Sequence, residues 1–275
     1  MAGGASSRMK KSLDKHSIDP SIRHVAQHHH KCLIPVGAQQ HPLLYYQLLI
    51  AKRAGVKRVF IITPLQQQGF IDFLNQPVIS STFARVKIDL MQQIPPEGAN
   101  KPLGTADAIQ QALNHFPSLK EASFVVMNGD NLYSVECLTA LFSLKENQNA
   151  LIGYDQEGLN FSKERIQKFA LLKVNPHNYL TDIIEKPSQE EIATASDTEN
   201  KIRVSMNIFK LYGPAIYPYL ASCPIDPIRK EKELPTAVKH YLKAFPKGFL
   251  TLPFCEHVPD LTSAEDISLL SRLSF

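Results

Sequence analysis

Hydrophobic and polar positions in the first half of the chain alternate between helix and strand periods. Leu44, Leu48 and Ala51 fall at the helical spacing i, i+4, i+7 and predict a helix over 41–54. The β-branched run at 58–63 is typical of a strand buried on both faces. The same alternation then predicts a helix at 67–75, a strand at 86–91, a Pro/Gly-rich loop at 93–104, a helix at 105–115 and a strand at 123–127.

The pattern of the second half is more mixed. Apolar runs predict strands at 150–154, 169–174, 179–185 and 202–209, and helices at 214–221, 234–242 and 263–270. The polar stretch at 188–200 is typical of a solvated helix or loop. Helices and strands that alternate in this way predict an α/β fold, Rossmann-like, with a mixed but mostly parallel central sheet flanked by helices. We expect a single domain over 1–275.

Composition narrows the class of protein. The 275 residues are 44% hydrophobic and 20% charged, which provides a sizeable core. No apolar run reaches the roughly 18–20 residues that span a bilayer, and no secretory pattern opens the chain, so we expect a cytoplasmic protein without a membrane partner. The net charge of +4 is dispersed rather than gathered in a basic stripe, which fits small phosphorylated ligands and predicts no nucleic-acid partner. The cysteines lie far apart and predict idle thiols: Cys32, Cys137, Cys223 and Cys255.

The first ten residues, M-A-G-G-A-S-S-R-M-K, carry the first candidate chemistry. Gly3 and Gly4 permit close backbone approach, so successive N–H groups can surround phosphate oxygens. Arg8 offers a planar donor fork to the β- and γ-phosphates. A plain turn explains the glycine pair equally well, and the Walker pattern is absent.

Later motifs follow this opening in a fixed order. They are Lys31 before L-I-P-V, the L-G-T-A of 103–106, the G-D-N of 129–131 and the E-K-P of 185–187. In this order they resemble the sugar nucleotidyltransferase family, which includes glucose-1-phosphate thymidylyltransferases and N-acetylglucosamine-1-phosphate uridylyltransferases. The resemblance covers nearly the whole chain. It implies a nucleotidyltransferase enzyme whose substrates are a nucleoside triphosphate and a sugar 1-phosphate, with Mg²⁺ as cofactor.

The resemblance also implies roles, with a nucleotide-binding half at 1–130 and a sugar-binding half at 131–275. It assigns the triphosphate to Arg8 and Lys31, the sugar phosphate to Lys186, and the sugar hydroxyls to Glu185 and Asn207. It assigns Mg²⁺ to Asp130 and Asp260. The remaining nucleotide contacts are Ala2, Gly3, Gly4, Gln93 (or its neighbour Gln92), Gly104 and Thr105.

These residue types suit the chemistry. A sugar-phosphate oxygen attacks the α-phosphorus in line and is already ionised, so positioning and cations matter more than a general base. Asp130 ends a central strand, where open α/β sheets bind ligands, and Mg²⁺ takes one or two carboxylates plus phosphate oxygens. Plainer interpretations stay open: a turn residue for Asp130, a helix-start charge for Asp260, a surface ion pair for Glu185 with Lys186, and a helix N-cap for Thr105.

Two features depart from the family pattern. Residues 12–30 separate Arg8 from Lys31 more widely than in relatives, and we expect a mobile polar flap there. If the piece is helical, His24 and His28 have the spacing to chelate a transition metal. Relatives also carry an apolar strand before A-G-G that this sequence lacks. We interpret this as a truncated or misassigned start, because the alternative, an absent central strand, would damage the sheet.

Two other functions compete with sugar nucleotidyl transfer. Isoprenoid or cofactor cytidylyltransferases share an A-G-G-x-S-S-R-M opening, although L-G-T-A and E-K-P belong to the sugar enzymes. A non-catalytic regulatory homologue would bind the same ligands without turnover, but such proteins tend to lose charges, and Arg8, Lys31, Asp130 and Lys186 are all present. The base, the sugar and the oligomeric state are left open by the sequence.

Overall fold

The computed structural model describes residues 1, 7–16, 18–99 and 101–271. The chain divides into two compact units. Unit 1 takes in Met1–Pro102, Asn128–Val135 and Pro259–Phe275, and unit 2 takes in Leu103–Met127 and Glu136–Val258. Each unit is therefore built from separate stretches of sequence. The single domain over 1–275, with halves that meet at residue 130, stays a prediction.

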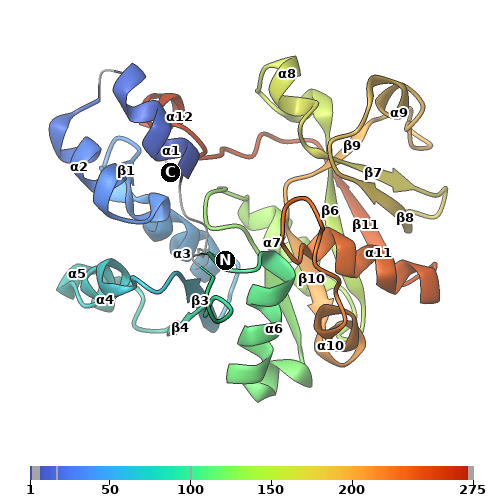
Figure 1. Ribbon diagram of the computed structural model, residues 1–275, viewed down its shortest axis with the longest axis horizontal. Helices are drawn as coiled ribbons and strands as arrows, with labels where there is room; N and C mark the ends of the chain where they lie inside the picture. The colour runs from blue at the N-terminus through green and yellow to red at the C-terminus, as the bar shows by residue number, and fades with distance from the viewer. Residues whose placement is uncertain (2–6, 17, 100, 272–275) are drawn as a thin grey trace. The chain divides into compact units, whose positions relative to one another are not determined.

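Unit 1 combines helices with two small sheets (Figure 1). Strand β1 (Pro35–Val36) pairs antiparallel with β2 (His41–Pro42), and β3 (Arg58–Thr63) pairs parallel with β4 (Lys87–Gln92). The α-helices of this unit are α1 (Ser7–Ser12), α2 (Pro20–His28), α3 (Leu43–Arg53), α4 (Gln68–Leu74), α5 (Pro77–Thr82) and α12 (Ala264–Leu270). Short 3₁₀ turns lie at η1 (Leu13–Lys15) and η2 (Lys31–Leu33). The predicted strand at 58–63 and the helix at 41–54 are confirmed to within two residues.

Residues 12–30 are packed into unit 1, so the expectation of a polar flap was wrong. Helix α2 begins after Asp19, whose carboxylate accepts the Ser21 N–H at 2.8 Å as an N-cap. Ala26 is fully buried in a hydrophobic cluster with Met9 and Leu13. Partly buried apolar side chains of the same stretch pack against this cluster: Ile18, Ile22 and Val25. Together with Ala26 they follow the helical spacing i, i+4, i+7, i+8. Histidines and other polar residues lie between them, so the sequence pattern did not reveal this apolar helix face.

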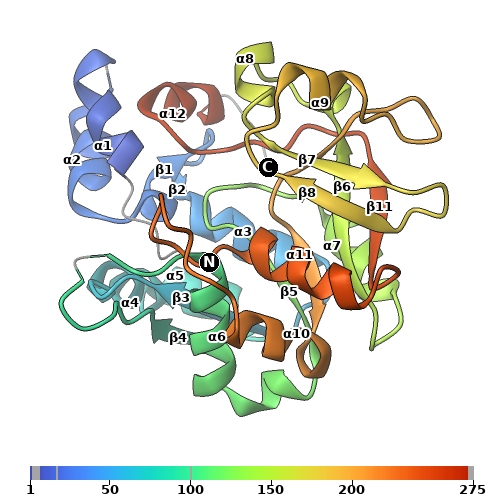
Figure 2. The ribbon, with the colours of Figure 1, turned by 45° about the vertical axis from the view of Figure 1, so that its right-hand side comes forward.

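Unit 2 is built on a seven-stranded sheet in the order β5-β10-β6-β9-β7-β8, with β11 also beside β6 (Figure 2). Its strands are β5 (Ser123–Val126), β6 (Asn149–Asp155), β7 (Ala170–Val174), β8 (Leu180–Ile184), β9 (Arg203–Ser205), β10 (Phe209–Tyr212) and β11 (Phe249–Phe254). Strand β6 is buried along its whole length and forms the middle of the core. Only β11 with β6 pairs in parallel among the described strands of this sheet.

The mixed α/β class is confirmed, but a mostly parallel central sheet is not. Parallel neighbours need a crossover of about a dozen residues or more, whereas a short turn joins β7 to β8 and makes them an antiparallel hairpin. The strand predicted at 202–209 is in fact two strands, β9 and β10. Asn207 lies between them with φ of +59°, in the left-handed region that interrupts an extended strand.

Helices α10 (Gly213–Ala221) and α11 (Leu234–Ala244) pack against each other and against strands of the unit 2 sheet, and in Figure 2 they lie in front of it. Helix α6 (Thr105–His115) also contacts α10 and has the predicted bounds. The remaining helices of this region are α7 (Val135–Ser143), α8 (Lys163–Ile166) and α9 (Gln189–Ala193), with 3₁₀ turns η3 (Pro117–Lys120) and η4 (Gln156–Gly158). In the described part of the chain, no helix has the length and apolar character to cross a membrane. The cysteines are free, and burial raises the pKa of Cys32 and of Cys137 to about 12.

Candidate active site

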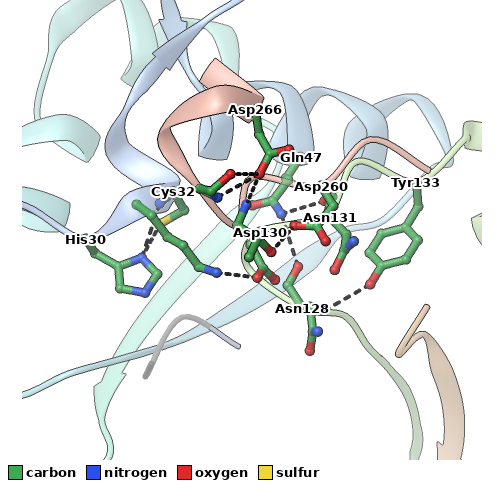
Figure 3. A network of polar contacts seen from close by, with 12 residues as sticks. His30, Cys32, Gln47, Asn128, Asp130, Asn131, Tyr133, Asp260 and Asp266 are labelled. Atoms are coloured by element: carbon green, nitrogen blue, oxygen red, sulfur yellow. Dashed lines mark hydrogen bonds and ion pairs between the residues drawn. The ribbon is translucent and has the colours of Figure 1, made fainter. Parts of the chain in front are cut away.

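The Gly129-Asp130-Asn131 motif forms a turn in unit 1 that brings two predicted site residues together (Figure 3). The Asp130 carboxylate forms an ion pair with the ammonium of Lys31, 99 positions away in sequence. Their side chains are only 19% and 14% exposed. Lys31 begins η2, directly after His30, whose Nδ1 accepts the Cys32 N–H at 3.2 Å. A cation and a carboxylate therefore face each other in a partly desolvated place, where charges act more strongly than at an open surface.

Gln47 of α3 supports this turn by hydrogen bonds to its backbone. Its buried amide Nε2 donates to the carbonyl oxygen of Asn128 at 3.1 Å and to that of Asn131 at 2.8 Å. The Asn128 N–H in turn donates to the Tyr133 hydroxyl at 3.3 Å. One side chain thus spans both ends of the Asn128–Asn131 turn and fixes the backbone that carries Asp130 (Figure 3).

Asp260 comes to the same turn from the C-terminal segment of unit 1. Its backbone pairs with Asn131 in an isolated antiparallel bridge, and the next residue, Leu261, donates its N–H to the Asp130 carbonyl oxygen at 2.8 Å. The Asp260 carboxylate accepts the Thr262 hydroxyl at 2.6 Å. Helix α12 then starts with a capping box between Ser263 and Asp266.

The residues at this turn fit a magnesium ion. Asp130 and Asp260 supply hard carboxylate oxygens from two backbone segments that are hydrogen-bonded to each other. The Lys31 ammonium on Asp130 shows that the carboxylate is already oriented to receive a cation. Two carboxylates match the one or two that Mg²⁺ takes when the substrate's phosphates provide further oxygens. No cluster of three or more His, Cys, Asp or Glu side chains with metal-site geometry occurs among the described residues.

The other nucleotide-side predictions of unit 1 have mixed outcomes. Ala2, Gly3 and Gly4 lie outside the described residues. Arg8 is described and exposed on α1. Gln93 is buried and extends the parallel ladder of β3 and β4, since its N–H donates to the Thr63 carbonyl at 2.9 Å. Its contact with a base stays a prediction.

Gly104 and Thr105 lie in unit 2, at the start of α6. Gly104 has φ of +105°, and an added Cβ would stand 2.8 Å from the Lys232 carbonyl oxygen, so glycine is required here on two grounds. Gly104 is also the N-cap residue of α6, so the N-cap alternative for Thr105 was wrong. The Thr105 hydroxyl instead donates to Glu233 at 3.0 Å and accepts the Leu234 N–H at 2.8 Å. It therefore caps the start of α11.

Glu185, Lys186 and Asn207 also belong to unit 2. Lys186 and Asn207 both take left-handed backbone angles, with φ of +51° and +59°. This region is uncommon for a lysine, above all one that precedes a proline, and costs on the order of 1–3 kcal/mol. Asn207 is held there by its N–H, which donates to the Ser205 hydroxyl at 3.1 Å. Such strain at two residues that the motifs single out is typical of functional positions.

Comparisons with known proteins place the chain in a family. The sequence model of the family described as nucleotidyl transferase matches residues 22–243. The chain belongs to this family. The matched range includes Lys31, Asp130 and Lys186, and it leaves out Arg8 and Asp260.

Solved structures share the fold of this nucleotidyl transferase family member. An apo UDP-glucose pyrophosphorylase matches with a TM-score of 0.69 at 17% identity, over 97% of this chain and 93% of that one. A putative glucose-1-phosphate thymidylyltransferase from Bacillus anthracis, in complex with a sucrose, matches with 0.68 at 17% identity, over 100% and 94%. A UDP-glucose pyrophosphorylase complexed with UDP-glucose matches with 0.66 at 17% identity, over 88% and 89%.

One cluster in this nucleotidyl transferase was missed by the sequence analysis. Arg229 of unit 2 contacts three carboxylates, at 3.4 Å from Glu185, 3.5 Å from Glu231 and 3.2 Å from Glu233. Burial and a hydrogen bond with Glu231 raise the pKa of Glu233 to about 7. The charged run R-K-E-K-E at 229–233, directly before a helix, was the available signal. Glu185 thus pairs with Arg229, and not with Lys186 as the surface-pair alternative held.

Proposed function

We propose that this nucleotidyltransferase transfers a nucleotidyl group from a nucleoside triphosphate to a sugar 1-phosphate, releasing pyrophosphate and forming an NDP-sugar. The observation that carries the proposal is the pairing of Lys31 with Asp130, beside Asp260, on one fixed turn. This is a charge arrangement for a triphosphate and its metal. The order of the motifs and the fold shared with UDP-glucose pyrophosphorylase support the sugar 1-phosphate as acceptor.

Unit 1 residues act on the triphosphate in this proposal. Arg8 and Lys31 bind its β- and γ-phosphate oxygens and offset the negative charge of the pyrophosphate as it leaves. Asp130 and Asp260 would hold Mg²⁺, which would supply positive charge to neutralise and orient the triphosphate. Lys31 then exchanges part of its contact with Asp130 for a contact with phosphate.

Unit 2 residues position the acceptor. Lys186 binds the phosphate of the sugar 1-phosphate. The Glu185 carboxylate accepts hydrogen bonds from sugar hydroxyls, and the Asn207 amide accepts and donates them. Arg229 keeps the Glu185 carboxylate in place through its ion pair. No general base is assigned, because the attacking phosphate oxygen is ionised at neutral pH. The residues accelerate the reaction by alignment and charge neutralisation.

The proposal is tested by pyrophosphate release. The purified chain is incubated with Mg²⁺ and each nucleoside triphosphate against a panel of sugar 1-phosphates that begins with glucose 1-phosphate. Release that needs both substrates and Mg²⁺ is the expected result. Release with CTP and a non-sugar alcohol phosphate, but with no sugar 1-phosphate, would instead support the cytidylyltransferase function. Binding without turnover in every combination would support the regulatory homologue.

A further inference from the structure

Helix α2 carries two histidines on one exposed face, and the proposed function uses neither. His24 and His28 are four positions apart, which places side chains on neighbouring turns of the same face. Both side chains are exposed, and their ring centroids lie 4.5 Å apart with the ring planes inclined at 45°.

The ring separation matches the geometry of a shared metal ligand pair. With zinc–nitrogen bonds of about 2.0–2.1 Å, a ring centroid lies roughly 3.2 Å from the metal, and bond angles of about 90–110° then separate two centroids by roughly 4.5–5.2 Å. The observed 4.5 Å falls at the lower end of this range. Rotation of either exposed ring about its χ2 angle, which is broad for histidine, aims a nitrogen at the ion without moving the helix.

Three other histidines have different partners. His30 is buried, and its Nδ1 lies 3.1 Å from the Cys32 sulfur. The Nδ1 of His257 accepts the Asn160 N–H at 3.1 Å, and His41 stacks on Tyr45. The α2 pair differs from these three in presenting two neighbouring imidazoles to solvent.

We propose that His24 and His28 form a bidentate site for a borderline divalent transition metal such as Zn²⁺ or Ni²⁺. Imidazole nitrogen suits these ions and not Mg²⁺, so the site is chemically distinct from the carboxylates at Asp130 and Asp260. Because no third side-chain ligand joins the pair among the described residues, water completes the coordination and the ion exchanges readily. A bound ion ties the last turn of α2 and thereby stabilises the hydrophobic cluster that α2 shares with Met9 and Leu13.

The test is a zinc titration of the untagged protein by calorimetry, with excess Mg²⁺ present to occupy carboxylate sites. One zinc site is expected in the wild type. His24→Ala and His28→Ala should each weaken zinc binding at least about tenfold, which corresponds to about 1.4 kcal/mol. His177→Ala, which removes an exposed histidine elsewhere, should leave zinc affinity unchanged.

A matched variant keeps the number of histidines and removes only the spacing. In His24→Gln combined with Gln27→His, the two imidazoles stand on adjacent residues that point to different sides of the helix. This variant should fold with the wild-type melting temperature in the absence of metal, and should lose the rise in Tm that Zn²⁺ and Ni²⁺ give the wild type. Wild-type zinc affinity in this variant, or no measurable zinc binding by the wild type, would overturn the proposal. Neither readout depends on nucleotidyl transfer.

Discussion

The Asp130 turn of unit 1 and the Lys186 segment of unit 2 differ in how their charged side chains are shielded and held. At the turn, Lys31 and Asp130 are mostly shielded from solvent and already paired, and Gln47 holds the backbone of Asp130 by two hydrogen bonds. Lys186 is exposed and sits on a left-handed backbone. The Lys186 charge also acts on a carboxylate of the same unit, Asp226. The main-chain N–H groups of Arg229 and Ile228 lower the pKa of Asp226 most, and the charges of Arg229 and Lys186 lower it further.

The two units therefore constrain their proposed site residues in different ways. In unit 1 the partly desolvated charges are fixed before any ligand binds, as electrostatic stabilisation of a developing charge requires. In unit 2 a long, solvated side chain leaves room to adjust to an acceptor, and the backbone at Lys186 and Asn207 supplies the constraint instead. Loss of the Asp130 charge should therefore reduce turnover, whereas loss of either lysine should weaken binding of the substrate that its unit is proposed to bind.

Asp130→Asn should have the largest effect. It removes the charge that holds the cation while it keeps the side-chain shape, so we expect kcat to fall about 100-fold or more, the scale of a lost transition-state charge stabiliser. Steady-state rates over a range of Mg²⁺ concentrations measure this, and high Mg²⁺ should restore part of the rate. Asp72→Asn, at an exposed aspartate of the same unit, serves as control. More than half of wild-type kcat in Asp130→Asn would remove this residue from the site.

Glu233 makes the stability of unit 2 depend on pH. Its pKa is about 7 in the folded chain against an ordinary 4.5, chiefly through burial. The folded state thus keeps a proton that the unfolded state has lost, so its stability falls as pH rises from about 4.5 to about 7 and stays lower above that. Between pH 5 and pH 8 the wild type should lose about 2–3 kcal/mol of its free energy of unfolding through Glu233, and Glu233→Gln should abolish this loss.

Urea unfolding of wild type and variant at both pH values measures the Glu233 contribution, and Glu121→Gln is the exposed control. If wild type and Glu233→Gln lose equal free energy of unfolding over this interval, Glu233 is ionised normally in the folded state.

Gln47→Met tests whether the turn is held as the structure indicates. The substitution keeps the side-chain length but removes both donated hydrogen bonds, so the Asn128 and Asn131 carbonyls lose a buried donor. We expect the free energy of unfolding to fall by about 2 kcal/mol. We also expect the half-maximal rate to need a higher Mg²⁺ concentration, because Asp130 is less well fixed. Gln68→Met, at an exposed glutamine, should change stability by less than about 0.5 kcal/mol. Equal stability of the two variants would mean that Gln47 does not support the turn.

Local pattern in the sequence predicted most elements but not the contacts that build the site. Helix α6 and strand β3 had the predicted bounds because their apolar period and end signals lie within the element itself. The meeting of Lys31 with Asp130 was implied only by the family resemblance, since 99 positions separate them. Gln47 was missed for the same reason, because its partners lie 81 and 84 positions away.

The errors also have physical causes. Residues 12–30 contain enough polar side chains to mask an apolar helix face, so their composition favoured a flap although Ala26 is fully buried. The mostly parallel sheet was inferred from the alternation of predicted helices and strands in the first half, and the same topology was then expected for the second half. There, short turns make hairpins, and a left-handed Asn207 divides one predicted strand into two.

The two proposed lysine roles give the smallest expected effects and the sharpest contrast. Lys31→Ala should raise the KM for the nucleoside triphosphate about tenfold, or about 1.4 kcal/mol, with little change in the KM for sugar 1-phosphate. Lys186→Ala should do the reverse. Lys57→Ala in unit 1 and Lys168→Ala in unit 2, at exposed lysines that the account gives no role, should change neither constant.

Measuring both KM values in Lys31→Ala and Lys186→Ala therefore tests the division of labour between the two units most directly. The account predicts a crossover, in which each variant is impaired toward one substrate and the impaired substrates differ. If Lys186→Ala raises only the KM for the triphosphate, or if both variants are impaired toward the same substrate, the assignment of unit 1 to the triphosphate and unit 2 to the sugar 1-phosphate is contradicted.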